Sequence, residues 1–277
     1  MPIARDNQTW LADLRASGDQ RDSALAALHD TLLRVLPAAL ASWLSPDTGH
    51  FDAFLEDVIQ ETLMRVLDRL DTFEGRSQFT TWVYKIAIRI ALNELRHRKW
   101  KEVSLDSLEE SDEPDEMPSE RFASSDPHPE SVLERKDAME LVKRIFDEEL
   151  TPRQRAVMMA VNVQDVPLEV VAKRIGTNRN TLYKMMHDAR LKLKHRLERE
   201  GLSPEELLNK LVMTEEHEIS CDDVHQLLDQ FTEMKMRGED VAHLMPLVEK
   251  HLDLCPDCRE EHEALIQALE FEKQMGE

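Results

Sequence analysis

The feature that most constrains the fold of this chain is an acidic stretch that interrupts an otherwise helix-forming sequence. Residues 102–135 contain twelve Asp and Glu but only two Lys and Arg, with several prolines among them. Low hydrophobicity with high charge is typical of a segment that cannot bury a core, and acidic self-repulsion keeps it extended. The sequence therefore predicts a flexible linker over residues 102–130, with folded parts on both sides.

Charge is distributed unevenly along the chain, whose net charge is −21. Residues 76–101 hold seven Lys and Arg against one Glu, and residues 151–199 hold eleven against four Asp and Glu. Residues 200–277, in contrast, hold 21 acidic and six basic residues. The overall charge argues against nucleic acid as a partner, but local basic blocks can neutralise phosphates. The sequence thus contains two candidate nucleic-acid-binding blocks.

Apolar residues recur at helical spacing through most of the chain, and only seven residues are glycine. Both features favour helices. The predicted helices span residues 20–44, 51–72, 78–98, 152–161, 167–175 and 177–198, and an acidic helical segment follows over 203–277.

These helices predict an all-α fold in four parts. The parts are a first helical domain at 1–101, the linker at 102–130, a second helical domain at 131–200 and an acidic C-terminal segment at 201–277. No apolar run approaches the length needed to cross a membrane. Residues 1–10 also lack the pattern of a signal peptide, so we expect a cytoplasmic protein without a membrane partner.

Residues 168–184 (LEVVAKRIGTNRNTLYK) have the spacing of a helix-turn-helix. A short amphipathic helix ends at Gly176, and a second helix begins after a tight turn. The second helix of such a motif places its N-terminal residues in the major groove, where Asn and Arg suit adenine and guanine edges. The predicted base contacts are Asn178, Arg179, Asn180, Thr181 and Lys184, and the basic residues further along the helix that suit phosphates are Arg190, Lys192, Lys194 and Arg196. The alternative is an amphipathic helix pair without a ligand.

Two stretches of this block resemble the promoter −35-reading domain of the sigma-70 family, in its extracytoplasmic-function (ECF) group. Residues 150–157 (LTPRQRAV) resemble the opening of that domain, and residues 181–193 (TLYKMMHDARLKL) resemble its recognition helix. In the first domain, residues 54–66 (FLEDVIQETLMRV) resemble the polymerase-docking helix, and residues 73–87 (FEGRSQFTTWVYKIA) resemble the −10 melting and reading segment. The resemblance covers about residues 10–199. It implies a sigma factor that binds core RNA polymerase and the −35 and −10 elements of promoter DNA.

The resemblance also assigns roles within the first domain. Charge alone favours a solvated surface for the polar face of residues 51–72, whereas the resemblance implies docking to polymerase. The implied docking residues are Glu56, Asp57, Gln60 and Glu61.

Residues 78–98 combine aromatic and basic side chains, a mixture that suits unpaired bases. Phe79 and Trp82 share a stripe with apolar neighbours and are expected in the core. The candidate DNA contacts are Tyr84, Lys85, Arg89, Asn93 and Arg96. The sequence departs from the family at two of them, because family members often carry Asn in place of Arg89 and Asp in place of Asn93.

All three cysteines lie in the C-terminal quarter, where His251, Cys255 and Cys258 have H-x3-C-x2-C spacing. Pro256 cannot continue a helix, so one helix should end near His251 and another should begin at Pro256, which brings the three side chains to one junction. Zinc usually takes four such ligands, and Cys221 is the obvious fourth. His217 and His225 are alternative candidates for this fourth ligand.

Residues 219–272 resemble the zinc-binding anti-sigma domain, fused here to a sigma factor. A helical hairpin with incidental thiols is the alternative. A catalytic zinc is not expected, because four protein ligands leave no open position.

The sequence thus predicts an ECF sigma factor without enzyme activity, whose C-terminal zinc-binding segment contacts and regulates the sigma domains in cis. Thiol oxidation that releases the metal would change that contact. The rival readings are a stand-alone helix-turn-helix regulator and a polymerase-binding antagonist.

Overall fold

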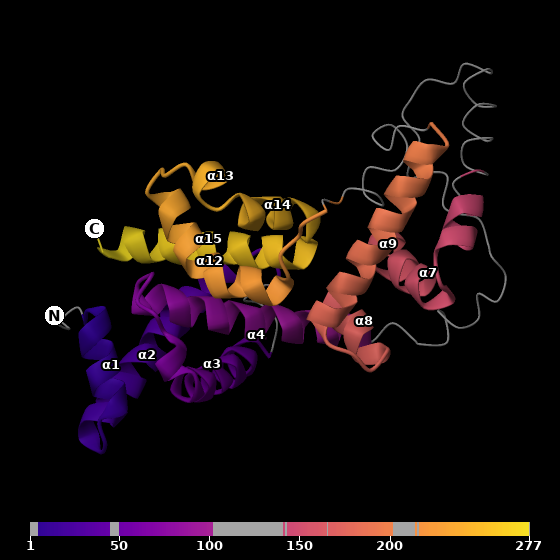
Figure 1. Cartoon of the computed structure of the whole chain (residues 1–277). Coiled ribbons are helices and arrows are strands. Elements are labelled where there is room, and N and C mark those ends of the chain that lie inside the picture. Colours follow the sequence, from indigo (N-terminus) through magenta and orange to yellow (C-terminus); the bar gives the residue numbers. More distant parts are fainter. Residues whose placement is uncertain are drawn as a thin grey trace. The chain divides into compact units, whose positions relative to one another are not determined.

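The computed structural model of the chain describes residues 5–44, 50–101, 141, 143–164, 166–201, 214 and 216–276. Helices are the only regular secondary structure in these ranges (Figure 1), as the predicted all-α class requires. The linker predicted at 102–130 lies outside the described residues. None of the described helices is both long and apolar enough to span a membrane.

The chain forms two compact units. The first combines Met1–Arg96 with Ile219–Glu277, so the C-terminal segment packs with the N-terminal part of the chain. The second unit comprises His97–Glu218. Each unit is described below by itself.

The N-terminal part of the first unit is a small helical bundle. Its helices are α1 (Asn7–Arg15), α2 (Asp19–Ala39), α3 (Phe51–Asp68), the 3-10 turn η1 (Leu70–Thr72) and α4 (Phe79–Lys101). An aromatic cluster joins α1, the loop after η1 and α4, because the Phe79 ring lies 5.7 Å from Trp10, 5.3 Å from Phe73 and 5.6 Å from Trp82. Phe79 and Trp82 are 0% and 7% exposed, which confirms the core positions predicted for them.

The C-terminal part of the first unit is a group of four helices. They are α12 (Cys221–Met236), α13 (Val241–Leu244), α14 (Pro246–Leu254) and α15 (Pro256–Gly276). Apolar side chains at helical spacing, among them Val224, Leu228 and Phe231, are buried. In Figure 1, α12 and α15 lie over α4, and α15 also packs against α2.

The second unit contains the predicted helix-turn-helix. Its helices are α7 (Pro152–Met158), the π-helical turn η3 (Met159–Val163), α8 (Leu168–Arg174) and α9 (Arg179–Arg199). Thr151 caps α7 in a capping box with Gln154. Gly176 takes a φ of +68° in the turn, a conformation that costs glycine little. The helix predicted from residue 177 begins at Arg179, because Asn178 is extended and its side chain caps the helix by accepting from the Thr181 N–H.

Candidate nucleic-acid interface and metal centre

The polar face of α4 is covered by α12 and α15, and one of its buried contacts is an ion pair with α12. Lys85 Nζ lies 2.7 Å from Asp229 Oδ1, and these side chains are only 4% and 8% exposed. Lys85 Nζ also donates to the carbonyl of Gln226, and Ser77 Oγ donates to the other oxygen of Asp229 at 2.6 Å. Burial lowers the pKa of Lys85, while the Asp229 carboxylate acts in the opposite direction.

Two arginines further along α4 are also held by carboxylates. Arg89 Nη2 lies 3.0 Å from Asp222 Oδ1 on α12. Arg96 Nη2 lies 2.5 Å from Glu260 Oε2 on α15 and donates to the carbonyl of Asp257. Burial alone would lower the pKa of Arg96, but the surrounding carboxylates outweigh it and raise that pKa. Arg96 Nη1 also donates to Asn93 Oδ1, at 3.3 Å.

Tyr84 completes the set of candidate contacts on α4. Its side chain is 1% exposed, and its hydroxyl donates to Glu272 Oε1 on α15 at 2.8 Å. Burial raises the pKa values of both groups. All five candidate DNA contacts of the first domain therefore lie on one helix, and four of them have polar partners in the C-terminal segment.

The partners on α12 were not identified from the sequence, although a signal for them exists. Asp222, Gln226, Asp229 and Glu233 recur at spacings of four, three and four residues, which places them on one face of a helix. Glu233 Oε1 accepts from Thr81 Oγ1 and from the Gln78 N–H at the start of α4. We refer to these four α12 residues as the acidic stripe.

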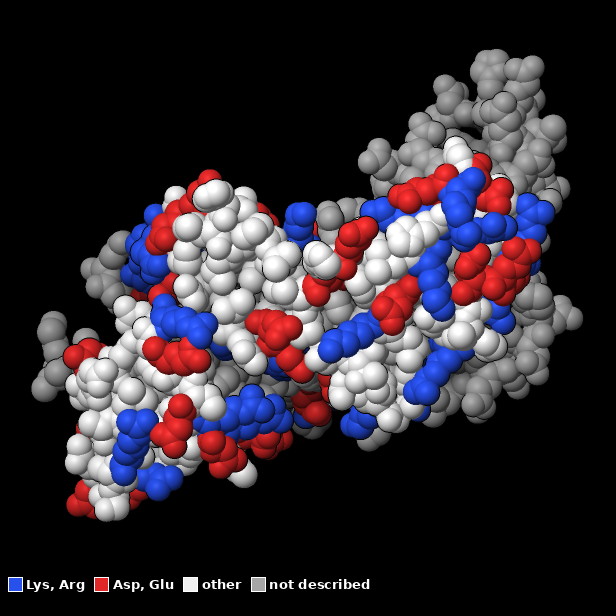
Figure 2. Space-filling model, viewed as in Figure 1, with Lys and Arg blue, Asp and Glu red and all other residues white. Residues whose placement is uncertain are grey.

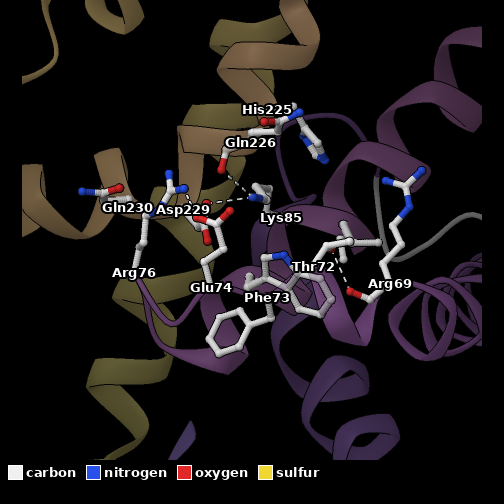
Figure 3. A pocket seen from close by; sticks show the side chains of 12 residues that line it. Arg69, Thr72, Phe73, Glu74, Arg76, Lys85, His225, Gln226, Asp229 and Gln230 are labelled. Carbon is white, nitrogen blue, oxygen red and sulfur yellow. Dashed lines mark hydrogen bonds and ion pairs between the residues drawn. The ribbon is translucent and has the colours of Figure 1, made fainter. Parts of the chain in front are cut away.

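A cavity of about 350 Å³ lies beside the Lys85–Asp229 pair. One wall comes from α4 and the loop before it, with Phe73 and Trp82 as aromatic lining and Arg69 and Arg76 as cationic lining. The opposite wall belongs to α12, as Figure 3 shows with the dashed contacts of Lys85 to Asp229 and Gln226. The cavity thus combines aromatic and cationic groups with Glu74, which pairs with Arg76, and Gln226 and Asp229 of the acidic stripe line its other side.

The four candidate polymerase-docking residues lie on α3. Asp57 and Gln60 are exposed, and the Glu56 and Glu61 side chains are each 44% exposed. Hydrogen bonds from Gln60 and His29 lower the pKa of Glu56, and Glu61 pairs with Arg65 at 2.7 Å. This face is accessible within the first unit while α12 and α15 cover α4.

The candidate DNA contacts of the helix-turn-helix divide into two groups. Asn178, Thr181 and Lys184 at the start of α9 are exposed, and Asn180 is half-buried. Arg179, however, is only 3% exposed and lies within the fold. Acidic and basic residues are interspersed on the face of the molecule drawn in Figure 2.

Two of the four candidate phosphate contacts of α9, Arg190 and Lys194, are engaged by the segment that follows that helix, whereas Lys192 contacts Gln154 and Arg196 pairs with Glu148, Glu149 and Glu200. Arg190 Nη2 lies 3.3 Å from Glu218 Oε2, with side chains 4% and 5% exposed. Tyr183 donates to the same carboxylate oxygen at 2.6 Å, and Lys194 Nζ donates to the carbonyl of Thr214 at 3.2 Å. Burial alone would raise the pKa of Glu218, but Arg190 and the hydrogen bonds lower it overall.

The four predicted metal ligands come together at one buried point. Ser220 caps α12 so that Cys221 is its first residue, and Pro256 begins α15 directly after Cys255. The ligand atoms all lie within 4.8 Å of one another, and the members of this group are Cys221, His251, Cys255 and Cys258. The alternative candidates His217 and His225 are not members of this group.

Two of the distances in this group are close to those around a tetrahedral ion. Cys221 Sγ lies 3.9 Å from Cys255 Sγ, and His251 Nε2 lies 3.3 Å from Cys258 Sγ. Tetrahedral bonds of about 2.3 Å to sulfur and about 2.05 Å to nitrogen place such ligand pairs about 3.8 Å and about 3.6 Å apart. His251 Nδ1 lies 2.9 Å from the carbonyl of Ile219, which can only accept. Nδ1 therefore carries the proton, and the lone pair of Nε2 points towards the thiols.

One family model matches part of this chain, and two known proteins are similar to about half of it. Residues 38–101 match the family model of sigma-70 region 2. The ECF RNA polymerase sigma factor SigG of Mycobacterium tuberculosis is 28% identical over 149 residues, which are 50% of this chain and 40% of SigG. The RNA polymerase sigma factor SigV of Bacillus subtilis is 24% identical over 147 residues, which are 53% of this chain and 78% of SigV.

This chain thus spans less than half the length of SigG. No solved structure matches it significantly. The residues that match sigma-70 region 2, 38–101, include α3 and α4.

Proposed function

We propose that this protein is an ECF-type sigma factor, which binds core RNA polymerase and directs it to promoters. The observation that carries the proposal is the sigma-70 region 2 domain at residues 38–101, followed along the chain by the helix-turn-helix of α8 and α9. Two proteins similar to this chain are named as sigma factors of RNA polymerase. A protein of this kind has no catalytic step of its own.

In this proposal the two units read two promoter elements. Asn178, Thr181 and Lys184 are exposed at the start of α9, where a recognition helix contacts base edges of the −35 element. Lys85, Arg89 and Arg96 on α4 contact the −10 element. The aromatic and cationic side of the cavity beside α4 suits an unpaired base, because rings stack on bases and arginines attract the backbone.

Polymerase docking is assigned to the exposed face of α3, through Glu56, Asp57, Gln60 and Glu61. A carboxylate-rich face suits a basic partner surface. The same face is not needed for packing, since Asp57 and Gln60 are exposed.

The C-terminal segment is proposed to hold zinc through Cys221, His251, Cys255 and Cys258. Four protein ligands favour a structural ion, which folds the segment and does not activate water. Cys221 begins α12, while the other three ligands come from α14 and the start of α15. The ion would therefore fix α12 relative to α15 and keep the acidic stripe facing α4.

We further propose that this segment inhibits the sigma domains in cis. Its carboxylates engage the α4 side chains that the proposed −10 contact requires. DNA and the docked segment cannot use the same cations at the same time. The segment must therefore move before promoter DNA binds α4.

Run-off transcription on genomic fragments with core RNA polymerase tests the sigma assignment. Core enzyme with an Asp229→Asn/Asp222→Asn variant is expected to start at discrete sites that core enzyme alone does not use. A variant that binds DNA tightly but never co-purifies with core polymerase would instead be a stand-alone regulator. A protein that binds core polymerase but only suppresses transcription would be an antagonist.

A further inference from the structure

We infer that the C-terminal segment blocks the DNA-binding step and leaves polymerase docking open, because its carboxylates take the places of DNA phosphates on the promoter-reading cations. This inference rests on the proposed sigma function and specifies how that function is regulated. In this inference the protein binds core polymerase while the C-terminal segment still covers α4, a state that we call closed. Such a complex waits for a signal before it engages promoter DNA.

The first support is the pairing of α4 with α12, which follows both helices over several turns. Gln78 and Thr81 contact Glu233, Lys85 contacts Asp229, and Arg89 contacts Asp222. Residue numbers rise on α4 as they fall on α12, so the two helices run antiparallel. A row of carboxylates thus lies along a row of donors, as a phosphate backbone would.

The second support comes independently from the other unit. Arg190 and Lys194 are two of the four α9 residues to which the sequence assigns phosphate contacts. Arg190 is paired with Glu218, and Lys194 donates to the Thr214 carbonyl. In each unit separately, oxygen atoms from the chain after α9 therefore contact cations proposed to bind DNA, while Lys192 and Arg196 have partners at Gln154, Glu148 and Glu149.

The third support is the exposure of α3 in the closed state. Asp57 and Gln60 are exposed, and the side chains of Glu56 and Glu61 are each 44% exposed. A segment that blocked polymerase would be expected to cover these side chains. Within the first unit, the acidic stripe faces α4 instead.

The test measures two affinities of the zinc-loaded full chain. The first is binding to core RNA polymerase from the source bacterium. The second is binding to a fluorescent random-sequence DNA duplex at low salt, because phosphate contacts do not depend on sequence. The variants are Asp229→Asn and Asp222→Asn, and the control is Glu263→Gln, which removes one exposed carboxylate from α15.

Asp229→Asn leaves Lys85 buried without a counter-charge, which disfavours the closed state on the order of a hundredfold or more. We expect DNA affinity to rise at least about tenfold, because less free energy is then needed to move the C-terminal segment away from α4 before DNA binds. The Glu263→Gln control should match the wild-type protein in both assays. Binding to core polymerase should stay within about twofold for all chains.

Asp222→Asn keeps the test decisive if Asp229→Asn fails to fold, since the Asp222 side chain is 53% exposed. It should raise DNA affinity by a smaller factor and leave zinc content unchanged. If variants gain affinity for core polymerase but not for DNA, the segment acts on docking and the inference is wrong. If no chain binds core polymerase at all, the proposed sigma function fails, whatever the DNA result. Equal DNA binding by every chain would also overturn the inference.

Discussion

The contact between Lys85 and Asp229 allows one energetic prediction to be worked out in detail. Both side chains are more than nine-tenths buried, and the charged atoms lie 2.7 Å apart. Removal of one partner of a buried pair costs about 3–5 kcal/mol, because the other charge stays desolvated. We therefore expect Asp229→Asn and Lys85→Met each to lower the unfolding free energy of the first unit by about 3 kcal/mol or more.

The double variant shows how much of this free energy comes from the interaction between Lys85 and Asp229. If the two residues act mainly through each other, Lys85→Met/Asp229→Asn should cost about as much as one single variant, which corresponds to a coupling energy of about 2–3 kcal/mol. Urea unfolding of the zinc-loaded protein followed by tryptophan fluorescence measures these values, since Trp10 and Trp82 are buried in this unit.

A matched control is available on the surface of the C-terminal segment. Arg237 and Glu239 also pair at 2.7 Å, but their side chains are 56% and 38% exposed. Glu239→Gln should cost no more than about 0.5–1 kcal/mol, because exposed pairs contribute little. A coupling energy below about 0.5 kcal/mol for Lys85 and Asp229 would refute the reasoning, since the buried pair would then contribute no more than an exposed one.

Three further predictions concern acid stability, the metal and DNA contact. Burial lowers the pKa values of His225 and His262 to about 4; since an unfolded imidazole has a pKa of about 6.5, stability is complete above that pH and is lost as pH falls towards 4. Urea unfolding at pH 5 should show an unfolding free energy about 2 kcal/mol lower per histidine than at pH 7.5, and His262→Phe should abolish the part of this loss that comes from His262. Equal unfolding free energies at pH 7.5 and pH 5 would contradict this. Cys255→Ser should abolish stoichiometric zinc and open α12–α15 to proteolysis, whereas His217→Ala should keep the metal; a Cys255→Ser protein with full zinc content would rule out the ligand set. Lys184→Ala should weaken promoter binding by about 1–3 kcal/mol and relax its specificity at unchanged stability, because Lys184 is proposed to contact base edges, whereas Arg179→Ala, at a buried position, should lower the melting temperature; an unchanged preference of Lys184→Ala for promoter over random-sequence DNA would exclude the base contact.

Local rules predicted much of this molecule from sequence. Thr151, Pro152 and Gln154 form the capping arrangement typical of a helix start. The pattern around Pro256 correctly ended one helix and began another, so the His and Cys ligands of that junction could be named in advance. These features depend on neighbours within a few residues, which is why the sequence predicts them well.

The contacts between distant segments could not be predicted in the same way. Tyr84 and Lys85 lie off the apolar stripe of α4, so the sequence alone suggests that they are exposed. They are buried because α12 and α15, more than 130 residues later in the chain, pack over them. Polar residues on one helix predict such packing only when the polar face of the partner helix is considered with them. The acidic stripe on α12 and the donors on α4 form such a complementary pair.

The start of α9 shows a smaller difference of the same origin. Asn178 and Arg179 have residue types that suit base edges, and the sequence assigned both to DNA. In the structure the Asn178 side chain is exposed and also caps the helix by accepting from the Thr181 N–H, whereas Arg179 is buried. The capping role follows from the residue type, whereas the burial of Arg179 depends on how α9 packs within its unit.

A reversible covalent tether between α4 and α12 tests the central claim most directly. Thr81 and Glu233 are in contact through a hydrogen bond of 2.6 Å, so a Thr81→Cys/Glu233→Cys variant can be joined by a short cleavable thiol linker. We expect an Asp229→Asn/Asp222→Asn protein that carries this tether, loaded with zinc, to bind core polymerase but to give no promoter-specific transcripts, and cleavage of the linker to restore the transcripts of that variant. Equal transcription before and after cleavage would contradict the claim that the docked segment keeps promoter DNA from α4.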